Sequence, residues 1–129
     1  MAGQGPEAGF VVEYYYKVRW GHQQEFLELF RRNHLPVLER ERELGRILRM
    51  AAAAPRYHAT EDGRWDYRVT IVFRDAAAAA ADSPVTGSET EMRRLFPDRG
   101  LFEREERTRF EILKAHWDLP LVDVELTGP

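Results

Sequence analysis

The stretch Trp65–Arg74, WDYRVTIVFR, decides the fold class because it alternates strictly in character. One row of side chains is large and apolar, and it comprises Trp65, Tyr67, Val69, Ile71 and Phe73. The other row comprises Asp66, Arg68, Thr70 and Val72. Successive side chains of a strand point to opposite faces, so the pattern predicts a strand with one buried and one more polar face. Asp62-Gly63, just before it, is a typical hairpin turn.

A second alternating stretch, Val11 to Arg19, predicts another strand of the same sheet. Its apolar row comprises Val12, Tyr14, Tyr16 and Val18, and its opposite row comprises Glu13, Tyr15, Lys17 and Arg19. We expect the apolar rows of both strands to meet the helices. The opposite rows would then form the sheet's second face.

Helical spacing of apolar residues predicts a helix from 23 to 44, which Pro36 should kink or split near Leu35. A second layer of short helices is expected from 75 to 107. Asp75 should cap the alanine-rich piece, and Ser88 with Glu91 forms a capping box for the next one.

Two further strands complete the predicted sheet, one at 46–57 and one at 109–117. In the latter we expect Leu113 to point away from the helices. Beyond Leu113 two phases stay open: either Trp117 points to that second face, or a bulge sends His116 there instead. The alternating tail, 121–126, is expected to be a short fifth strand. The order β-α-β-β-α-β predicts an α+β, ferredoxin-like domain over residues 10–126. It would have a four-stranded antiparallel sheet with helices on one face, and residues 1–9 would form a flexible arm.

The composition of the 129 residues excludes several classes of function. With a formal net charge of −3 and interspersed acids and bases, the chain lacks the basic stripe that nucleic-acid binding needs. It has no cysteine, which excludes disulfides and thiol catalysis. No apolar run approaches the roughly 20 residues of a membrane span, and the N-terminus has no signal-peptide pattern. We therefore expect a cytoplasmic protein with no nucleic-acid or membrane partner.

The second face of the sheet is uncovered in this architecture, and its mixed character leaves two interpretations open. It is either fully solvated or covered by a second copy of the chain. Two such sheets facing each other across a two-fold axis would form a barrel with a polar, partly enclosed cavity. The tail after Pro120 could then pair with an edge of the partner's sheet. We expect the homodimer.

Two segments carry a resemblance to a known superfamily. The stretch Phe30-Arg-Arg-Asn-His-Leu-Pro-Val-Leu38 and the closing Ala115-His-Trp-Asp118, together with the element order, resemble an uncharacterised bacterial branch of the dimeric alpha–beta barrel superfamily. That resemblance covers about residues 10–126. It implies a homodimeric ferredoxin-like barrel, but the superfamily includes cofactor-free monooxygenases, haem-degrading enzymes and lactone isomerases. Membership therefore does not select one function.

The candidate catalytic residues are His116 and His34, because histidine acts as acid or base near neutral pH. His116 lies two residues before Asp118, so the two side chains can share one face of a strand and the carboxylate could orient the imidazole. His34 follows Asn33 on an apolar helical stripe. For both histidines the competing interpretation is a structural side chain whose polar atoms are satisfied.

The candidate ligand-binding residues are Tyr15, Arg68, Thr70, Asn33 and Trp65. The first three share the second face, where they could hold an anionic oxygen, although a salt-bridged interface explains them equally well. The haem-degrading relatives use an Asn, a His and a Trp, but no motif of that family surrounds these residues here. We expect no cofactor and no metal site.

Two functions from different classes follow from these residues. One is a small-molecule-binding dimeric barrel without a catalytic motif. The other is a cofactor-free monooxygenase or isomerase acting on a small aromatic or anionic molecule. The sequence alone leaves open whether the protein is an enzyme.

Overall fold

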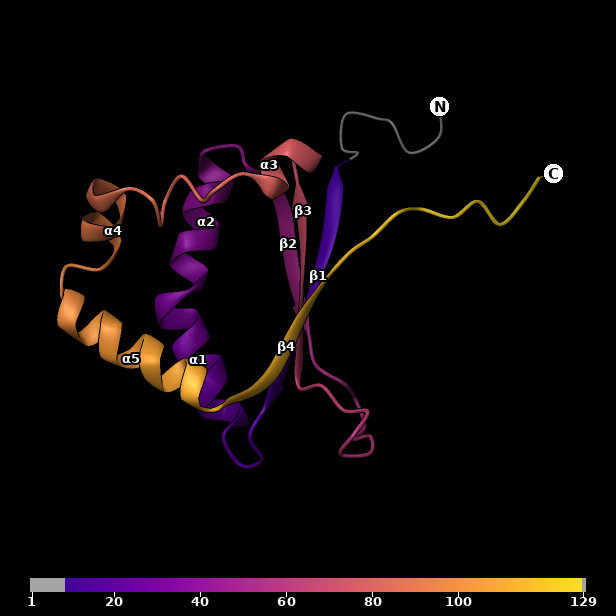
Figure 1. The fold of residues 1–129 in the computed structure, drawn as a ribbon, viewed down its shortest axis with the longest axis horizontal. Coiled ribbons are helices and arrows are strands. Elements are labelled where there is room, and N and C mark those ends of the chain that lie inside the picture. Colours follow the sequence, from indigo (N-terminus) through magenta and orange to yellow (C-terminus); the bar gives the residue numbers. More distant parts are fainter. Residues whose placement is uncertain (1–8, 129) are drawn as a thin grey trace.

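The computed structural model describes residues 9–128, which form one sheet with the main helices on one side (Figure 1). The strands are β1 (Phe10–Val18), β2 (Ile47–Ala53), β3 (Tyr67–Phe73) and β4 (Leu113–Pro120). The helices are α1 (Gln23–Asn33), α2 (Leu35–Glu43), α3 (Ala76–Ala80), α4 (Glu89–Leu95) and α5 (Arg99–Glu111). All but the last residue of the arm predicted at 1–9 lies outside the described residues.

The sheet has the strand order β2-β3-β1-β4, and all neighbouring strands are antiparallel. The two alternating stretches form its centre, where Tyr14 lies opposite Val69 and Tyr16 lies opposite Tyr67. This confirms the predicted ferredoxin-like α+β fold. It also confirms that the row of β1 and the row from Tyr67 to Phe73 share the face that the helices cover. Trp65, predicted for the same row, instead precedes β3 and contacts Tyr15.

Pro36 divides the first helical segment as the sequence predicts. Helix α1 ends at Asn33 and α2 begins at Leu35, with the proline in the first turn of α2. Proline is tolerated there because the first N–H groups of a helix have no partner within the helix. His34 is thereby fixed at the junction between the two helices, where its N–H donates to the Phe30 carbonyl at 2.9 Å.

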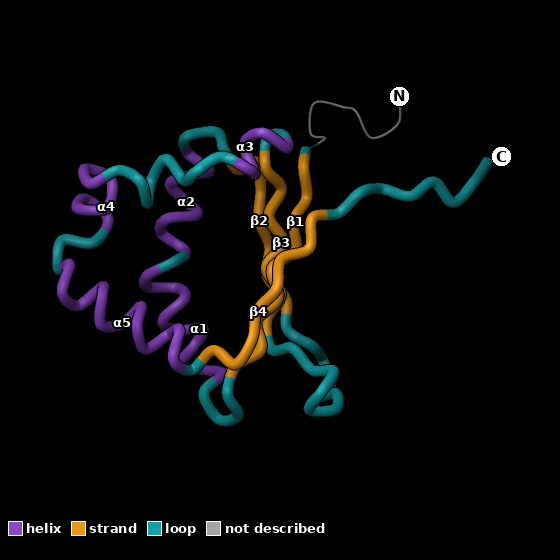
Figure 2. Tube along the Cα trace, viewed as in Figure 1, coloured by secondary structure: helices purple, strands orange, loops and turns teal. Residues whose placement is uncertain are grey.

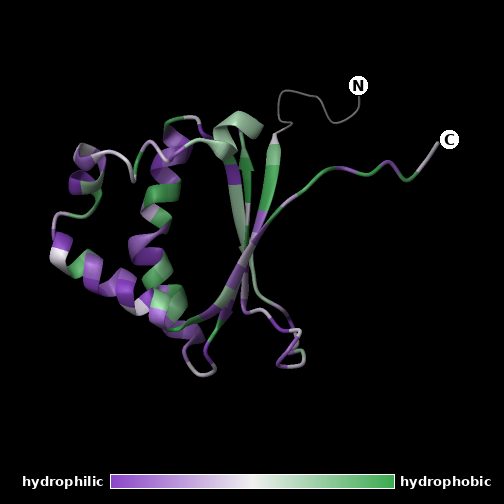
Figure 3. Ribbon diagram, viewed as in Figure 1, coloured by the Kyte–Doolittle hydropathy of each residue, from purple (hydrophilic) through white to green (hydrophobic). Residues whose placement is uncertain are grey.

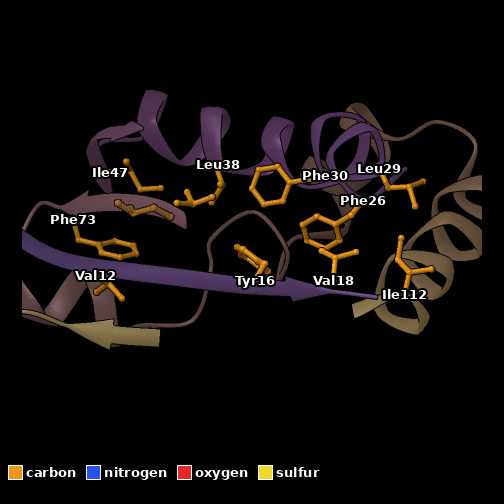
Figure 4. Close-up of a cluster of buried hydrophobic side chains, with 12 residues drawn as sticks. Val12, Tyr16, Val18, Phe26, Leu29, Phe30, Leu38, Ile47, Phe73 and Ile112 are labelled. Carbon is orange, nitrogen blue, oxygen red and sulfur yellow. The ribbon is translucent and has the colours of Figure 1, made fainter. Parts of the chain in front are cut away.

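The core lies between the sheet and the α1–α2 pair (Figure 4). Side chains from β1 and β3 meet side chains from the two helices, and Figure 4 labels Val12, Tyr16, Val18, Phe26, Leu29, Phe30, Leu38, Ile47, Phe73 and Ile112. Helix α5 is hydrophilic along most of its length (Figure 3). The favourable free energy of burying apolar area, about 25 cal/mol per Å², therefore comes mainly from the contact between the sheet and α1–α2.

The predicted fourth strand begins too early, and the error changes which face its side chains occupy. Residues 109–111 belong to α5, whose capping residue Ile112 donates its N–H to the Thr108 carbonyl at 3.1 Å. A bulge between Lys17 and Val18 then places Leu113 opposite Val18 and His116 opposite Tyr16. Both side chains face the helices, so the expectation that Leu113 points to the second face is wrong. Of the two phases left open beyond Leu113, the structure has the one with Trp117 on the second face. The alternation over 109–117 was too short to separate the last turn of a helix from the start of a strand.

The predicted second and fifth strands are also corrected. Strand β2 ends at Ala53 and does not extend to residue 57, in keeping with the weak strand propensity of its alanines. Leu121 still donates to the Val11 carbonyl at 2.9 Å, but residues 122–128 form no strand. Figure 2 shows this tail leaving the sheet on the side opposite the helices. Asp75 and Ser88 cap α3 and α4 as predicted.

Candidate functional site

A cavity of about 340 Å³ lies on the helix-covered side of the sheet, bounded by β1, β3, α2, residues 83–86 and the start of β4. Its apolar wall comprises Val37, Leu38, Val69, Ile71, Phe73, Phe110 and Leu113. Its polar lining comprises Tyr14, Tyr16, His34, Glu41, Arg46, Ser83, Thr86, Arg109, His116 and Asp118. Most of the surface that faces the cavity is apolar, although more of the lining residues are polar. An apolar surface with convergent polar groups is typical of small-molecule sites.

The strand β1 contributes two phenol side chains to this cavity. Within residues 9–128 the hydroxyls of Tyr14 and Tyr16 have no hydrogen-bond partner. Burial raises the pKa of both groups, and that of Tyr16 reaches about 12. Both hydroxyls therefore stay protonated near neutral pH and can donate a hydrogen bond into the cavity.

His34 enters the cavity from the α1–α2 junction. Its ring meets Phe30 edge-on, with the ring centroids 4.9 Å apart. Burial, with a smaller effect from the positive charge of Arg109, lowers the pKa of His34 to about 4. The imidazole is therefore neutral at physiological pH, so one ring nitrogen donates and the other accepts.

His116 lies at the cavity rim beside Asp118. Its ring stacks on Tyr16 with the centroids 6.2 Å apart, and its Nδ1 lies 3.8 Å from the Asp118 Oδ1. That distance is an ion-pair distance and not a hydrogen bond. Both side chains are about half exposed. The structure thus brings the two candidate catalytic histidines, from distant parts of the sequence, to one cavity.

Two ion pairs that sequence reasoning missed also face the cavity. Glu41 pairs with Arg46, whose guanidinium also donates to the carbonyls of Ala78 and Ala81 at 2.9 Å and so ties α2 to the α3 segment. Arg109 is only 5% exposed and pairs with Glu106. The spacing of three residues between Glu106 and Arg109 would indicate this ion pair on a helix. The predicted strand at 109–117 hides that spacing, because it places Arg109 outside the helix.

Three candidate ligand-binding residues, Tyr15, Arg68 and Thr70, lie on the uncovered face and away from this cavity. They converge on Glu13, which accepts from the Tyr15 hydroxyl at 3.1 Å and from the Thr70 hydroxyl at 3.0 Å. The Nε of Arg68 lies 3.4 Å from a Glu13 oxygen. Their proposed role in binding stays a prediction.

The other two candidates are separated from the cavity as well. Asn33 is buried and donates to Glu105 at 3.1 Å, which ties α1 to α5. Trp65 meets Tyr15 edge-on at 5.2 Å and lines a second hollow beneath the loop that joins β2 to β3. The structure therefore does not bring Asn33, His34 and Trp65 together.

The described part of the chain has neither a cluster of metal-binding side chains nor a membrane-spanning helix. Residues 9–128 contain no group of three or more His, Cys, Asp or Glu side chains placed to hold a metal ion. None of the helices in this range has the length and apolar character needed to span a membrane.

Comparison with known proteins shows a shared fold without sequence similarity. No protein-family model and no curated protein matches the sequence. An uncharacterized NIPSNAP domain protein from Burkholderia xenovorans matches with a TM-score of 0.55 at 15% identity, over 93% of this chain and 99% of that chain. A putative antibiotic biosynthesis monooxygenase from Bacteroides thetaiotaomicron matches with a TM-score of 0.51 at 11% identity, over 94% of both chains.

A third structure, a dimeric ferredoxin-like protein from an uncultured marine organism, matches with a TM-score of 0.51 at 5% identity, over 97% of this chain and 98% of that chain. Identities this low show the fold alone. They confirm the ferredoxin-like fold of the chain, as the sequence resemblance implied.

His34 should make stability depend on pH. Its pKa is about 4 in the folded protein, below the ordinary value of 6.5, so the unfolded chain binds the proton first as pH falls. The free energy of unfolding should therefore decrease as pH falls from about 6.5 to about 4. Urea denaturation at several pH values measures this. His34→Gln should flatten the dependence, whereas a control, His22→Gln at an exposed ion pair, should retain it.

Proposed function

We propose that the protein is a homodimer that binds a small, largely apolar molecule in the cavity between its sheet and helices. The observation that carries the proposal is the convergence of Tyr14, Tyr16 and His34, whose polar side-chain atoms lack hydrogen-bond partners in residues 9–128, on an apolar-walled cavity. These atoms are not sealed within the protein, so they can bond to a molecule that occupies the cavity. Such partners matter to a ligand that leaves water, because an unpaired buried donor or acceptor costs about 1–3 kcal/mol.

Catalysis is the second candidate function, as a cofactor-free monooxygenase or isomerase. The specific observation that favours it is the His116–Asp118 pair at the rim of the same cavity. An imidazole beside a carboxylate can act as a general base on an acidic C–H group of a bound molecule. The Bacteroides structure described above as a putative monooxygenase has the same fold. This supports the class of chemistry without identifying a substrate.

The uncovered face of the sheet supports the homodimer. Tyr15 stacks on Trp117 with an interplanar angle of 9° and the centroids 5.6 Å apart, and Leu119 lies opposite Glu13 on the same face. The tail beyond β4 adds apolar side chains between 121 and 126 that are not buried against any other part of residues 9–128. Exposed apolar side chains that gather on one surface often mark an interface. A second copy is the partner that the dimeric ferredoxin-like neighbours suggest.

Binding can be tested with 2-naphthamide, a neutral bicyclic probe that needs an apolar cavity and one hydrogen-bonding group. We expect measurable affinity by titration calorimetry. Thr86→Trp should lower that affinity about tenfold or more, because the indole would occupy the mouth of the cavity. Thr90→Trp, an exposed position on α4 outside the cavity lining, is the matched control and should bind normally. Equal affinities of the two variants would contradict this location.

Catalytic base activity can be tested with 2-tetralone, whose acidic C–H hydrogens exchange with deuterium when a base removes them. The wild-type protein in D₂O should accelerate the exchange observed by NMR. His116→Gln should reduce the rate about 10²-fold, the usual range for loss of a general base. If both proteins exchange the probe equally slowly, the enzyme hypothesis fails while the binding proposal stands.

Dimerisation should depend on the uncovered face. Light scattering at micromolar concentration should give twice the chain mass of 15.1 kDa. Trp117→Glu, or deletion of residues 121–129, should shift the protein toward monomer. Leu101→Glu, an exposed leucine on the helix side, is the control that should stay dimeric. A wild-type monomer that persists at high concentration would rule out the barrel.

A further inference from the structure

The end of the cavity near α5 has an excess of hydrogen-bond donors. Tyr16 donates from β1, Arg109 donates from α5, and the neutral imidazole of His34 can donate from one ring nitrogen. The rings of Tyr16 and Phe30 are 5.9 Å apart, and Phe30 also meets His34, so the phenol and the imidazole flank the same aromatic side chain. A ligand group at this end must therefore be mainly an acceptor.

Arg109 has capacity for a second anionic partner. Its Nε and Nη2 both lie within 3.0 Å of a single Glu106 oxygen, at 3.0 and 2.8 Å. Its guanidinium carbon lies 4.8 Å from the ring centre of Phe110 and 5.9 Å from that of Phe26. The third nitrogen, Nη1, has no hydrogen-bond or ion-pair partner among residues 9–128. A guanidinium has five N–H groups, so one carboxylate oxygen leaves most of them unused.

The other acids of the cavity do not satisfy this group. Glu41 is paired with Arg46 at the opposite end, and Asp118 lies at the half-exposed rim beside His116. Burying a cation is costly unless it is paired and fully hydrogen-bonded. The unused edge of Arg109 is not sealed within the protein, and Arg109 lines the cavity, so this edge can receive an additional oxygen that carries negative charge.

We infer that the cavity selects ligands that carry an anionic oxygen, a carboxylate or a phenolate, and that Arg109 and Tyr16 bind this oxygen. The inference rests on the proposed function, because it names the chemical class of the molecule bound in the same cavity. The apolar remainder of the ligand would lie against the wall formed by α2 and β3.

The effect of Arg109 on its neighbours agrees with this assignment. Its positive charge contributes to the lowered pKa of His34, and at Tyr16 it opposes the rise in pKa that burial causes. The charge therefore acts inside the cavity, and at Tyr16 the opposing effect of Glu106 is the smaller of the two. An ionised ligand oxygen at the same place would be stabilised by it.

Three naphthalene probes of nearly equal size test the inference. By titration calorimetry, 2-naphthoate should bind wild-type protein about tenfold or more tightly than 2-naphthamide. Neutral 2-naphthol distinguishes the two sources of the oxygen. The absorbance of the naphtholate ion on binding near neutral pH would indicate a site that also ionises phenols, whereas binding without ionisation would assign it to carboxylates.

A double variant, Arg109→Gln with Glu106→Gln, removes the cation without leaving a buried carboxylate unpaired. It should abolish the preference for 2-naphthoate over 2-naphthamide while retaining affinity for the amide. The control is Arg32→Gln with Glu105→Gln, an ion pair between α1 and α5 that lies outside the cavity lining. The control should keep the preference. Circular dichroism and thermal unfolding check that each variant is folded.

The outcomes separate the two proposals. If wild-type protein binds the amide and the carboxylate equally, the anion inference is overturned and the binding proposal stands. If the preference persists in the folded Arg109 variant, another group provides the selectivity and the assignment to Arg109 is overturned. If neither probe binds wild-type protein, both proposals fail together. The wild-type comparison decides the charge preference even if the double variant does not fold.

Discussion

The position of β1 between β3 and β4 is the constraint on which the rest of the structure depends. A strand with a neighbour on each side has its hydrogen bonds satisfied, so only its two faces remain for side-chain contacts. On one face, Tyr14 and Tyr16 point toward the helices and reach the cavity. On the other face, Tyr15 stacks on Trp117 and bonds to Glu13. Three consecutive tyrosines thus have two different environments because the strand alternates.

The cavity lies where α4 is attached to α2 and α5 is attached to α1, so that neither of these two helices lies directly over the strands. A small apolar cluster holds the α4 segment there, where Val85, Met92 and Phe96 pack with Val37 of α2. Figure 1 shows α4 and most of α5 standing away from the strands. The helix-facing side chains of β4 are therefore left without α4 or α5 above them, whereas Tyr16 of β1 packs against Phe26 and Phe30 of α1. His116, Tyr14 and Tyr16 all line the cavity.

Buried charges in this fold occur as pairs that fix the elements around the cavity. Arg46 with Glu41 joins α2 to the α3 segment, and Arg109 with Glu106 lies where α5 leads into β4. Breaking a buried pair on one side typically costs about 3–5 kcal/mol, because it leaves an uncompensated charge. The pairs therefore limit which residues can change, and they make paired substitutions the appropriate way to test the site.

The sequence by itself determined the layers and the central pairing. Strict alternation over Val11–Arg19 and Trp65–Arg74 gave two half-buried strands, Pro36 gave the helix break, and the order of elements gave the ferredoxin-like sheet. These features depend on residues that are close in the chain, so local periodicity and backbone chemistry are sufficient to predict them. The histidines His34 and His116 could be singled out for the same reason, as residue types suited to proton transfer.

Only the tertiary structure decided which candidates share a site. The phase of β4 depends on where α5 ends and on a bulge opposite Lys17 and Val18, and both are set by packing between segments that are distant in the sequence. That phase brings His116 to the cavity that His34 also lines, whereas Tyr15, Arg68 and Thr70 lie on the other face of β1 and β3. Arg109 changes in the same way, from an expected strand residue to a buried helical cation at the cavity. A one-residue shift in a strand moves every side chain to the opposite face, and no short-range pattern records such a shift.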